Sequence, residues 1–251
     1  MRALSAFAVG CLLILTSGAT HAAEIRVLSG NGARAAMQEL IARFERASGH
    51  KVSLHFEVNA ALHKKIEAGE RFDVAILNPG VLDALIKHGK VRAETRAGIG
   101  RAGLGVGVRA GAPKPDIGTL DAFKHALVSA NGVAYPGEGA SGKYFVSVVE
   151  RLGLTAQMKS KMRPSPAEDT VEVVARGEVD LVVVVASRIA NVPGVELVGP
   201  IPAEVQTWIG FAAGVANAAK EPAAAEALVR FLAAPEAAPV LKSLGVEPLP
   251  K

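Results

Sequence analysis

The sequence is poor in cysteine and in aromatic residues. Its single cysteine, Cys11, lies in an apolar segment near the N-terminus, and the 251 residues include one tryptophan and two tyrosines. Without that segment, the chain can form neither a disulfide nor a thiolate metal site. The six histidines show no metal-ligand spacing, and no serine lies in a nucleophile-elbow motif. The sequence therefore predicts neither a metal nor a cofactor.

Charge of one sign and long apolar runs are also scarce. Lys and Arg number 28 and Asp and Glu number 24, which gives a formal net charge of +4 at pH 7. No basic stretch is interleaved with aromatic residues, so nucleic acid is excluded as an expected partner. After the N-terminal segment, no apolar run approaches the roughly 20 residues that span a bilayer. We therefore expect a soluble monomer that folds on an apolar core.

The N-terminal segment has the pattern of a secretory signal peptide. Arg2 supplies a positive charge, residues 3–16 are almost all apolar, and residues 17–23 are mostly small. A membrane anchor is the alternative, and it fits less well because the apolar run is short. The sequence predicts a signal peptide over residues 1–23, cleaved after Ala22 or Ala23, and a periplasmic location.

Strand-like and helix-like segments alternate along the rest of the chain. Met37, Leu40, Ile41 and Phe44 recur at helical spacing, whereas residues 181–186 form a continuous apolar run typical of a buried parallel strand. Repeated units of this kind predict an α/β fold, with mostly parallel sheets flanked by helices in two lobes. The expected first lobe covers residues 24–102, the second covers 103–205, and the chain returns to the first lobe over 206–251.

Small and amide residues follow three predicted strands, where ligands of open α/β sheets bind. The loops are residues 29–32, 58–60 and 78–80, and each opens a predicted helix. Free backbone N–H groups and the helix dipole attract anions at such a position. Plain helix capping is the alternative for each loop alone. Together the loops predict an anion site that includes Ser29, Asn31, Gly32, Asn59 and Asn78.

A glycine-rich stretch later in the chain resembles part of a phosphate-binding loop. Residues 137–143 follow a predicted strand and precede a helix, but Tyr144 stands where such a loop needs Ser or Thr to hold magnesium. This argues against a nucleotide hydrolase and leaves an anion site at a helix N-terminus, with Ser141 and Gly142 as candidate ligand-binding residues. Thr170, in the first turn of another predicted helix, is a further candidate.

A second glycine pattern, at residues 98–103, matches the spacing of dinucleotide-binding loops. Its context is wrong for that role, because it follows a predicted loop and precedes a predicted strand. Arg101 within it lies at the expected crossing between the lobes. A guanidinium can hold a carboxylate or phosphate through two parallel hydrogen bonds, so Arg101 is a candidate ligand-binding residue. A solvated surface arginine is the alternative.

Four segments carry a family resemblance. They are residues 27–40 (VLSGNGARAAMQEL), 62–74 (LHKKIEAGERFDV), 139–152 (GASGKYFVSVVERL) and 231–248 (FLAAPEAAPVLKSLGVEP). Together they resemble the periplasmic molybdate-binding protein family, a branch of the ABC-transporter solute-binding proteins. The resemblance implies two similar α/β lobes, joined by two hinge strands, that close on an oxyanion. It also implies a small anionic ligand and an ABC-transporter membrane permease as partners.

The resemblance also implies where the ligand is held. In that family two serines, two backbone amides and a tyrosine hydroxyl bind the oxyanion. The serines fall at Gly32 and Asn59, the amides near Ser141 and Thr170, and the tyrosine at Val185. Three side-chain donors are therefore absent or changed, and each buried oxygen left unpaired costs about 1–3 kcal/mol. The replacements favour a larger organic anion, such as a carboxylate, over molybdate.

Two further segments, residues 100–106 (GRAGLGV) and 115–117 (PDI), are similar to those of periplasmic aconitate isomerases, which share this scaffold. This similarity implies an alternative function, the isomerisation of an unsaturated tricarboxylate. Such a reaction needs a base near the allylic carbon and positive charge near the carboxylates. Arg101 is the expected source of charge, and Glu138 and His63 are candidate bases.

Overall fold

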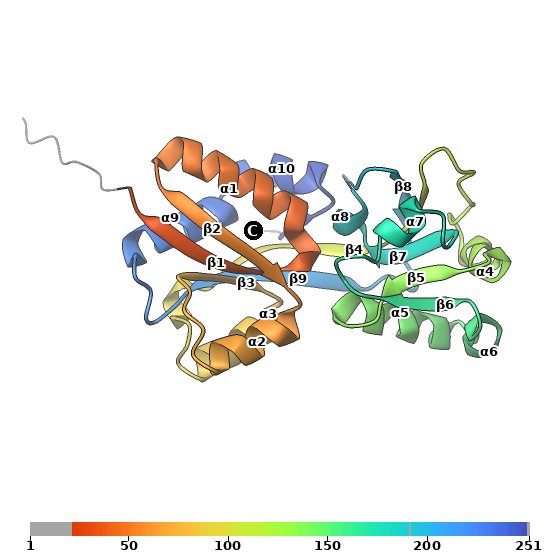
Figure 1. Cartoon of the computed structure of the whole chain (residues 1–251), viewed down its shortest axis with the longest axis horizontal. Coiled ribbons are helices and arrows are strands. Elements are labelled where there is room, and N and C mark those ends of the chain that lie inside the picture. Colours follow the sequence, from red (N-terminus) through yellow and green to blue (C-terminus); the bar gives the residue numbers. More distant parts are fainter. Residues whose placement is uncertain (1–21, 191, 250–251) are drawn as a thin grey trace, which may run out of the picture.

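A computed structural model describes residues 22–190 and 192–249 of the chain. The predicted signal peptide lies outside the described residues, apart from Ala22 and Ala23. The described residues form an elongated α/β structure with two lobes (Figure 1), so the fold class predicted from the sequence is confirmed. No helix among these residues is long and apolar enough to cross a membrane.

The first lobe is a sheet with helices on both faces. It comprises β1 (Glu24–Gly30), the short 3-10 turn η1 (Asn31–Ala33), α1 (Arg34–Ser48), β2 (Lys51–Glu57), α2 (Asn59–Glu67), β3 (Val74–Leu77), α3 (Pro79–Lys87), η2 (Ala93–Thr95), the first part of β4 (Ala97–Arg109), β9 (Trp208–Val215), α9 (Pro222–Ala233), η3 (Pro235–Ala237), α10 (Ala238–Ser243) and β10 (Glu247–Pro248). The strand order is β2-β1-β3-β9-β4, with β1, β2 and β3 parallel. Helices α1, α9 and α10 lie on one side of the sheet, and α2 and α3 lie on the other (Figure 1).

The second lobe repeats this plan on the second part of β4. It comprises α4 (Leu120–Ser129), β5 (Val133–Pro136), α5 (Ala140–Arg151), α6 (Thr155–Met158), β6 (Met162–Ser165), α7 (Glu172–Ala175), β7 (Leu181–Val185), α8 (Ala186–Ile189) and β8 (Val195–Pro200). Strand β7 lies between β4 and β5, and β6 follows β5. Strand β5 is parallel to both β6 and β7, while β8 pairs antiparallel with β4.

Strand β4 joins the two lobes. Its first part pairs with β9 as far as Gly103, which lies opposite Trp208. From Leu104, which lies opposite Val185, the strand pairs with β7 instead. The chain returns to the first lobe between β8 and β9. Two chain crossings, β4 and residues 201–207, therefore connect the lobes, and a rotation about them would change the distance between the lobes.

The glycines of β4 occupy a strand, not a loop. The sequence predicts a strand that begins after residues 98–103, whereas β4 begins at Ala97 and includes them. Glycine weakens an isolated strand, but here neighbouring groups pack directly against the backbone. A Cβ atom at Gly100 would lie 2.6 Å from the carbonyl oxygen of Glu247. The missing side chain thus makes room for β10, which pairs with β4 at this point.

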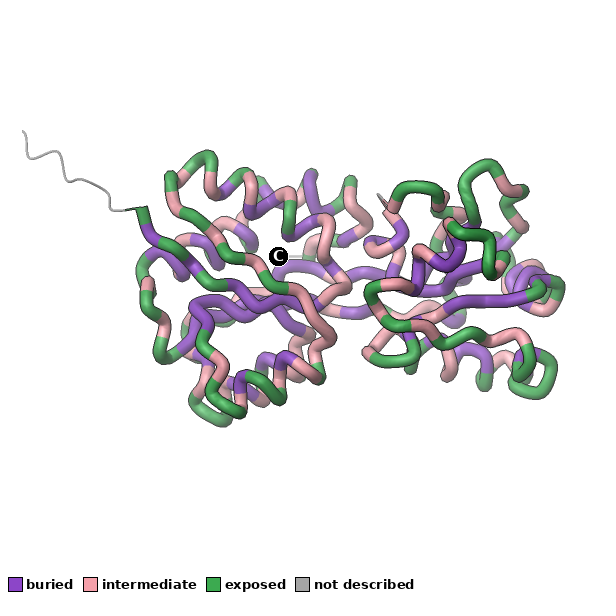
Figure 2. The backbone as a smooth tube through the Cα atoms, in the orientation of Figure 1, coloured by how far each residue is buried: buried purple, intermediate pink, exposed green. Residues whose placement is uncertain are grey.

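Apolar periodicity explains the main elements. The four apolar residues that recur at helical spacing in α1 are all buried, and Gly49 ends the helix with a left-handed φ of 76°. All five residues of β7 are buried, as the continuous apolar run predicts. Figure 2 shows that the buried stretches follow the strands through both lobes. One apolar cluster includes residues of both lobes, so the core continues across the hinge.

Candidate functional site

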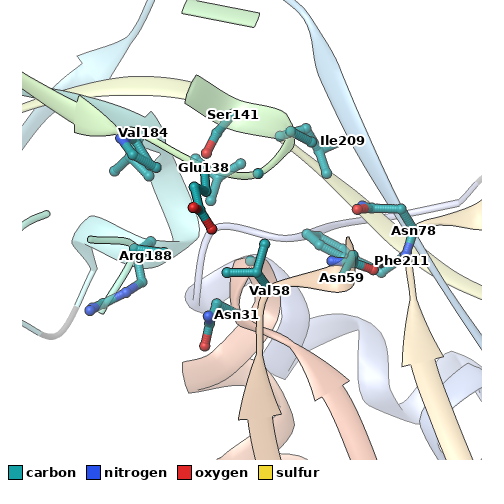
Figure 3. Close-up of a pocket in the computed structure, with 16 residues that line it drawn as sticks. Asn31, Val58, Asn59, Asn78, Glu138, Ser141, Val184, Arg188, Ile209 and Phe211 are labelled. Atoms are coloured by element: carbon teal, nitrogen blue, oxygen red, sulfur yellow. Dashed lines mark hydrogen bonds between the residues drawn. The ribbon is translucent and has the colours of Figure 1, made fainter. Parts of the chain in front are cut away.

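A cavity lies between the two lobes. Its volume is about 60 Å³, and it is partly open to solvent. The first lobe contributes the loops after β1, β2 and β3 and two side chains of β9. The second lobe contributes the N-terminal end of α5, the end of β7, and α8 (Figure 3). The cavity is therefore at the carboxyl ends of parallel strands, where ligands of α/β sheets bind.

Three asparagines line the first-lobe side of the cavity: Asn31, Asn59 and Asn78. Oδ1 of Asn31 accepts a hydrogen bond from Nη2 of Arg34 at 2.6 Å, and Oδ1 of Asn59 accepts one from the backbone N–H of Asn78 at 2.8 Å. Neither α2 nor α3 has a side-chain cap. Asn59 thus connects the loops after β2 and β3, whereas Asn31 is held by the first residue of α1. Nδ2 of Asn31 and of Asn59 are the remaining donors for a ligand.

The N-terminal end of α5 lies on the second-lobe side, where Ser141 lines the cavity. The helix begins at Ala140, after Gly139 with a φ of 97°, a conformation that favours glycine. The first N–H groups of a helix have no acceptor within it, so they can bind an anion. Gly142 does not line the cavity, but a Cβ atom there would overlap the carbonyl oxygen of Pro136. Gly142 therefore lets α5 begin close to the end of β5.

Arg188 on α8 also lines the cavity, although it is not among the residues predicted from the sequence. Its side chain is 11% exposed, and Nη2 donates to the carbonyl of Glu168 at 2.9 Å and to Oε1 of Glu172 at 3.0 Å. Its Nε atom is buried and has no hydrogen-bond partner among the described residues. A buried donor without an acceptor is unfavourable. Ligands of α/β sheets bind where parallel strands end. Arg188 could have been predicted on this basis, because α8 directly follows β7.

A second guanidinium lies close to Arg188 where the lobes approach each other. Arg34, at the start of α1, stacks over the ring of Phe56 at 4.3 Å. Burial lowers the pKa of Arg34, and the charge of Arg188 lowers it further, while Glu172 and Glu168 raise it. Arginine remains protonated at any ordinary pH even so. Two permanent cations and two carboxylates therefore meet beside the cavity.

The remaining walls of the cavity are largely apolar. Val58, Val184, Ile209 and Phe211 line it from both lobes (Figure 3). A Cβ atom at Gly32 would lie 2.9 Å from Cε1 of Phe211. The phenylalanine ring therefore fills the space that a side chain at position 32 would need.

Two of the sequence-predicted residues are buried away from the cavity. Ser29 is fully buried in β1, and its hydroxyl donates to the carbonyl of Gly30 at 3.2 Å. Thr170 is also fully buried, and its hydroxyl donates to the carbonyl of Pro166 at 2.7 Å. Both hydroxyl groups have acceptors inside the protein, and neither residue is among those that line the cavity.

The structure does not bring Arg101 to the cavity either. Its guanidinium stacks over the ring of Trp208 at 4.3 Å and lies 3.4 Å from Oε2 of Glu247. The side chain is 42% exposed, and it faces β10 because β4 and β10 pair at this residue. Of the two candidate bases, Glu138 lines the cavity and His63 does not.

Two α/β lobes around an interlobe cavity define a protein of the periplasmic-binding class. A family model described as bacterial extracellular solute-binding protein matches residues 25–247. The chain is 32% identical to an aconitate isomerase of Pseudomonas sp., over 98% of this chain and 97% of that protein. It is 28% identical to the molybdate-binding protein ModA of Azotobacter vinelandii, over 92% of each chain.

A solved structure, the periplasmic molybdate-binding protein of Azotobacter vinelandii, has the same fold. It superposes with a TM-score of 0.77 at 20% identity, covering 90% of this chain and 100% of that one. The chain therefore belongs to the bacterial extracellular solute-binding protein family. Both resemblances found in the sequence, to molybdate-binding proteins and to aconitate isomerases, are confirmed.

Proposed function

We propose that this protein is a periplasmic solute-binding protein whose interlobe cavity holds a small organic anion with carboxylate groups. The composition of the cavity wall carries this proposal. Asparagine amides and the side chain of Arg188 line the same cavity as Val58, Val184, Ile209 and Phe211. Donors and a guanidinium suit carboxylates, and apolar side chains suit the carbon skeleton that connects them.

An inorganic oxyanion fits this wall poorly. It presents oxygen on every side, and each oxygen buried without a donor costs about 1–3 kcal/mol. Gly32 and Val185 stand where molybdate-binding relatives are expected to have hydroxyl groups, and both line the cavity. Phe211 occupies the space beside Gly32. The hydroxyl donors are therefore replaced by apolar surface.

The relatives indicate which carboxylate to test first. Aconitate, in the name of the relative that is 32% identical to this chain, is a tricarboxylate. The family supports two broader parts of the proposal, export from the cytoplasm and delivery of the ligand to an ABC-transporter permease. Cleavage near Ala22 or Ala23, a periplasmic location and function as a monomer remain predictions from the sequence.

Calorimetric titration of the mature protein tests the ligand class. We expect cis- or trans-aconitate to bind, and molybdate, tungstate and sulfate to bind much more weakly. Arg188→Ala should weaken tricarboxylate binding about tenfold or more, because a hydrogen bond to a charged group contributes about 1.5–3 kcal/mol. Arg230→Ala, on the exposed face of α9, is the matched control, with a side chain that is 70% exposed. Tight molybdate binding, or unchanged affinity in Arg188→Ala, would contradict the proposal.

Arg101→Ala in the same titration tests the arginine that the sequence favoured. A large loss of tricarboxylate affinity would show that Arg101 contributes to ligand binding. We expect little change, because the guanidinium of Arg101 is held by Trp208 and Glu247.

An isomerase is the second candidate function, and the position of Glu138 favours it. Glu138 places a carboxylate in the cavity wall next to the N-terminal end of α5. A carboxylate there can remove an allylic proton from a bound tricarboxylate, which leaves a carbanion delocalised over three carbons. Return of the proton to the other end of those three carbons moves the double bond, which can re-form with the other geometry. Interconversion of cis- and trans-aconitate by the purified protein would support this role. Glu138→Gln should then abolish turnover and leave binding within a few-fold. Binding without any interconversion would exclude this candidate.

A further inference from the structure

Two imidazoles and one carboxylate meet on the surface of the first lobe, away from the interlobe cavity. His63 and Glu67 lie one turn apart on α2, and His88 directly follows α3. Nδ1 of His88 lies 2.8 Å from Oε1 of Glu67, and Nε2 of His63 lies 3.7 Å from the same oxygen. The three potential ligand atoms are all within 4.8 Å of one another.

One nitrogen of this cluster, on His63, could accept or donate a hydrogen bond and does neither among the described residues. This atom, Nε2, is buried. Its distance of 3.7 Å from Oε1 of Glu67 is too long for a hydrogen bond. Two ligand atoms on one tetrahedral Zn²⁺ ion are about 3.3 Å apart, given bonds of about 2.0–2.1 Å. A small adjustment of the side chains would therefore place all three atoms around one metal ion.

We propose that His63, Glu67 and His88 bind a divalent transition-metal ion of the Zn²⁺ kind. Imidazole nitrogen suits Zn²⁺, Ni²⁺ and Cu²⁺, and a carboxylate completes a common three-residue ligand set. Water takes the remaining position, because these side chains are about one third to one half exposed, at 32%, 33% and 50% respectively. The sequence showed no such motif, because the third ligand, His88, lies after the end of a different helix from His63 and Glu67.

A metal ion bound by this cluster would connect the C-terminal ends of α2 and α3. Glu67 is the last residue of α2, and His88 follows the last residue of α3. The opposite ends of the same helices carry Asn59 and Asn78 into the interlobe cavity. A nine-residue helix is about 13 Å long, so the ion connects the two helices at their outer ends, distant from the cavity. Binding of the metal should therefore stabilise this part of the lobe.

Metal titration of the chelator-treated mature protein tests the site, with ZnCl₂ as the probe. We expect one Zn²⁺ per chain and a higher midpoint of thermal unfolding when it binds. His63→Gln and His88→Gln should each weaken binding about tenfold or more and remove the thermal shift. His125→Gln, on α4 in the second lobe, is the matched control and should leave both unchanged. Circular dichroism of each variant confirms that it is folded.

The outcomes of this titration are separate from those of the anion titration. Absence of stoichiometric Zn²⁺ binding, or binding that survives both substitutions, would overturn the metal site. Either result leaves the proposed anion site unaffected, because no residue of the cluster lines the interlobe cavity.

Discussion

At the scale of single residues, the pair Gly32 and Phe211 distinguishes this cavity from an oxyanion site. The resemblance to molybdate-binding proteins implies a serine at position 32, yet the ring of Phe211 lies where that side chain would be. Gly32 lacks the hydroxyl donor of a serine, and Phe211 adds apolar surface to the cavity wall. The effect of a substitution at position 32 therefore depends on the residue at position 211.

Gly32→Ser should destabilise the protein and weaken carboxylate binding. A Cβ atom would lie 2.9 Å from Cε1 of Phe211, and overpacking of this kind costs about 1–3 kcal/mol. Gly32→Ser combined with Phe211→Ala should recover part of that loss, which urea unfolding of the two single variants and the double variant measures. Gly80→Ser is the matched control, since nothing lies within 4 Å of a Cβ atom there. Additive losses in the double variant would show that the two residues are independent.

The candidate site could be predicted from the sequence only where strand ends were clear. Asn31, Asn59 and Ser141 follow strands with strong apolar patterns, and the structure brings all three to the cavity. Ser29 lies in the same predicted loop as Asn31, and Thr170 precedes α7, but the direction of a side chain depends on packing that no local pattern records. Their roles in ligand binding remain predictions.

At the scale of secondary-structure elements, α8 connects the two lobes. The hydroxyl of Ser187 donates to the carbonyl of Gly32 at 2.6 Å, across the boundary between the lobes. The next residue, Arg188, lines the cavity. A four-residue helix spans about one turn, which is too short to show helical periodicity, so α8 could not be predicted from its apolar pattern. The fifteen-residue helix α1 was predicted because its apolar spacing repeats.

Ser187→Ala should weaken ligand binding without unfolding the protein. It removes one hydrogen bond between the lobes, worth about 0.5–1.5 kcal/mol, and affinity should fall by about two- to tenfold. Calorimetry measures the affinity, and small-angle X-ray scattering should show a larger average opening of the free protein. Ser243→Ala is the matched control, because its hydroxyl donates within α10, to the carbonyl of Val240 at 2.9 Å. Equal affinity in Ser187→Ala and the unmodified protein would show that this bond does not contribute to closure.

At the scale of the whole molecule, two lobes share one continuous core but meet through two narrow crossings. Strand β4 exchanges β9 for β7 between Gly103 and Leu104. This architecture followed from the alternation of strands and helices and from the family motifs. The course of β4 did not, because its glycines suit a strand only when β10 and Gln206 pack against them. Long-range packing of this kind leaves no local trace in the sequence.

Ligand binding should change the fluorescence of the single tryptophan. The chain contains one tryptophan, and Trp208 lies opposite Gly103 at the crossing, 40% exposed. Closure of the lobes moves β4 relative to the return segment, so the exposure of the indole ring and its contact with Arg101 should change. A saturable emission shift on addition of cis- or trans-aconitate is the expected result. Arg188→Ala should require a correspondingly higher ligand concentration for the same shift. Calorimetric binding with no change in emission, and no change in X-ray scattering, would show that the lobes bind the ligand without moving.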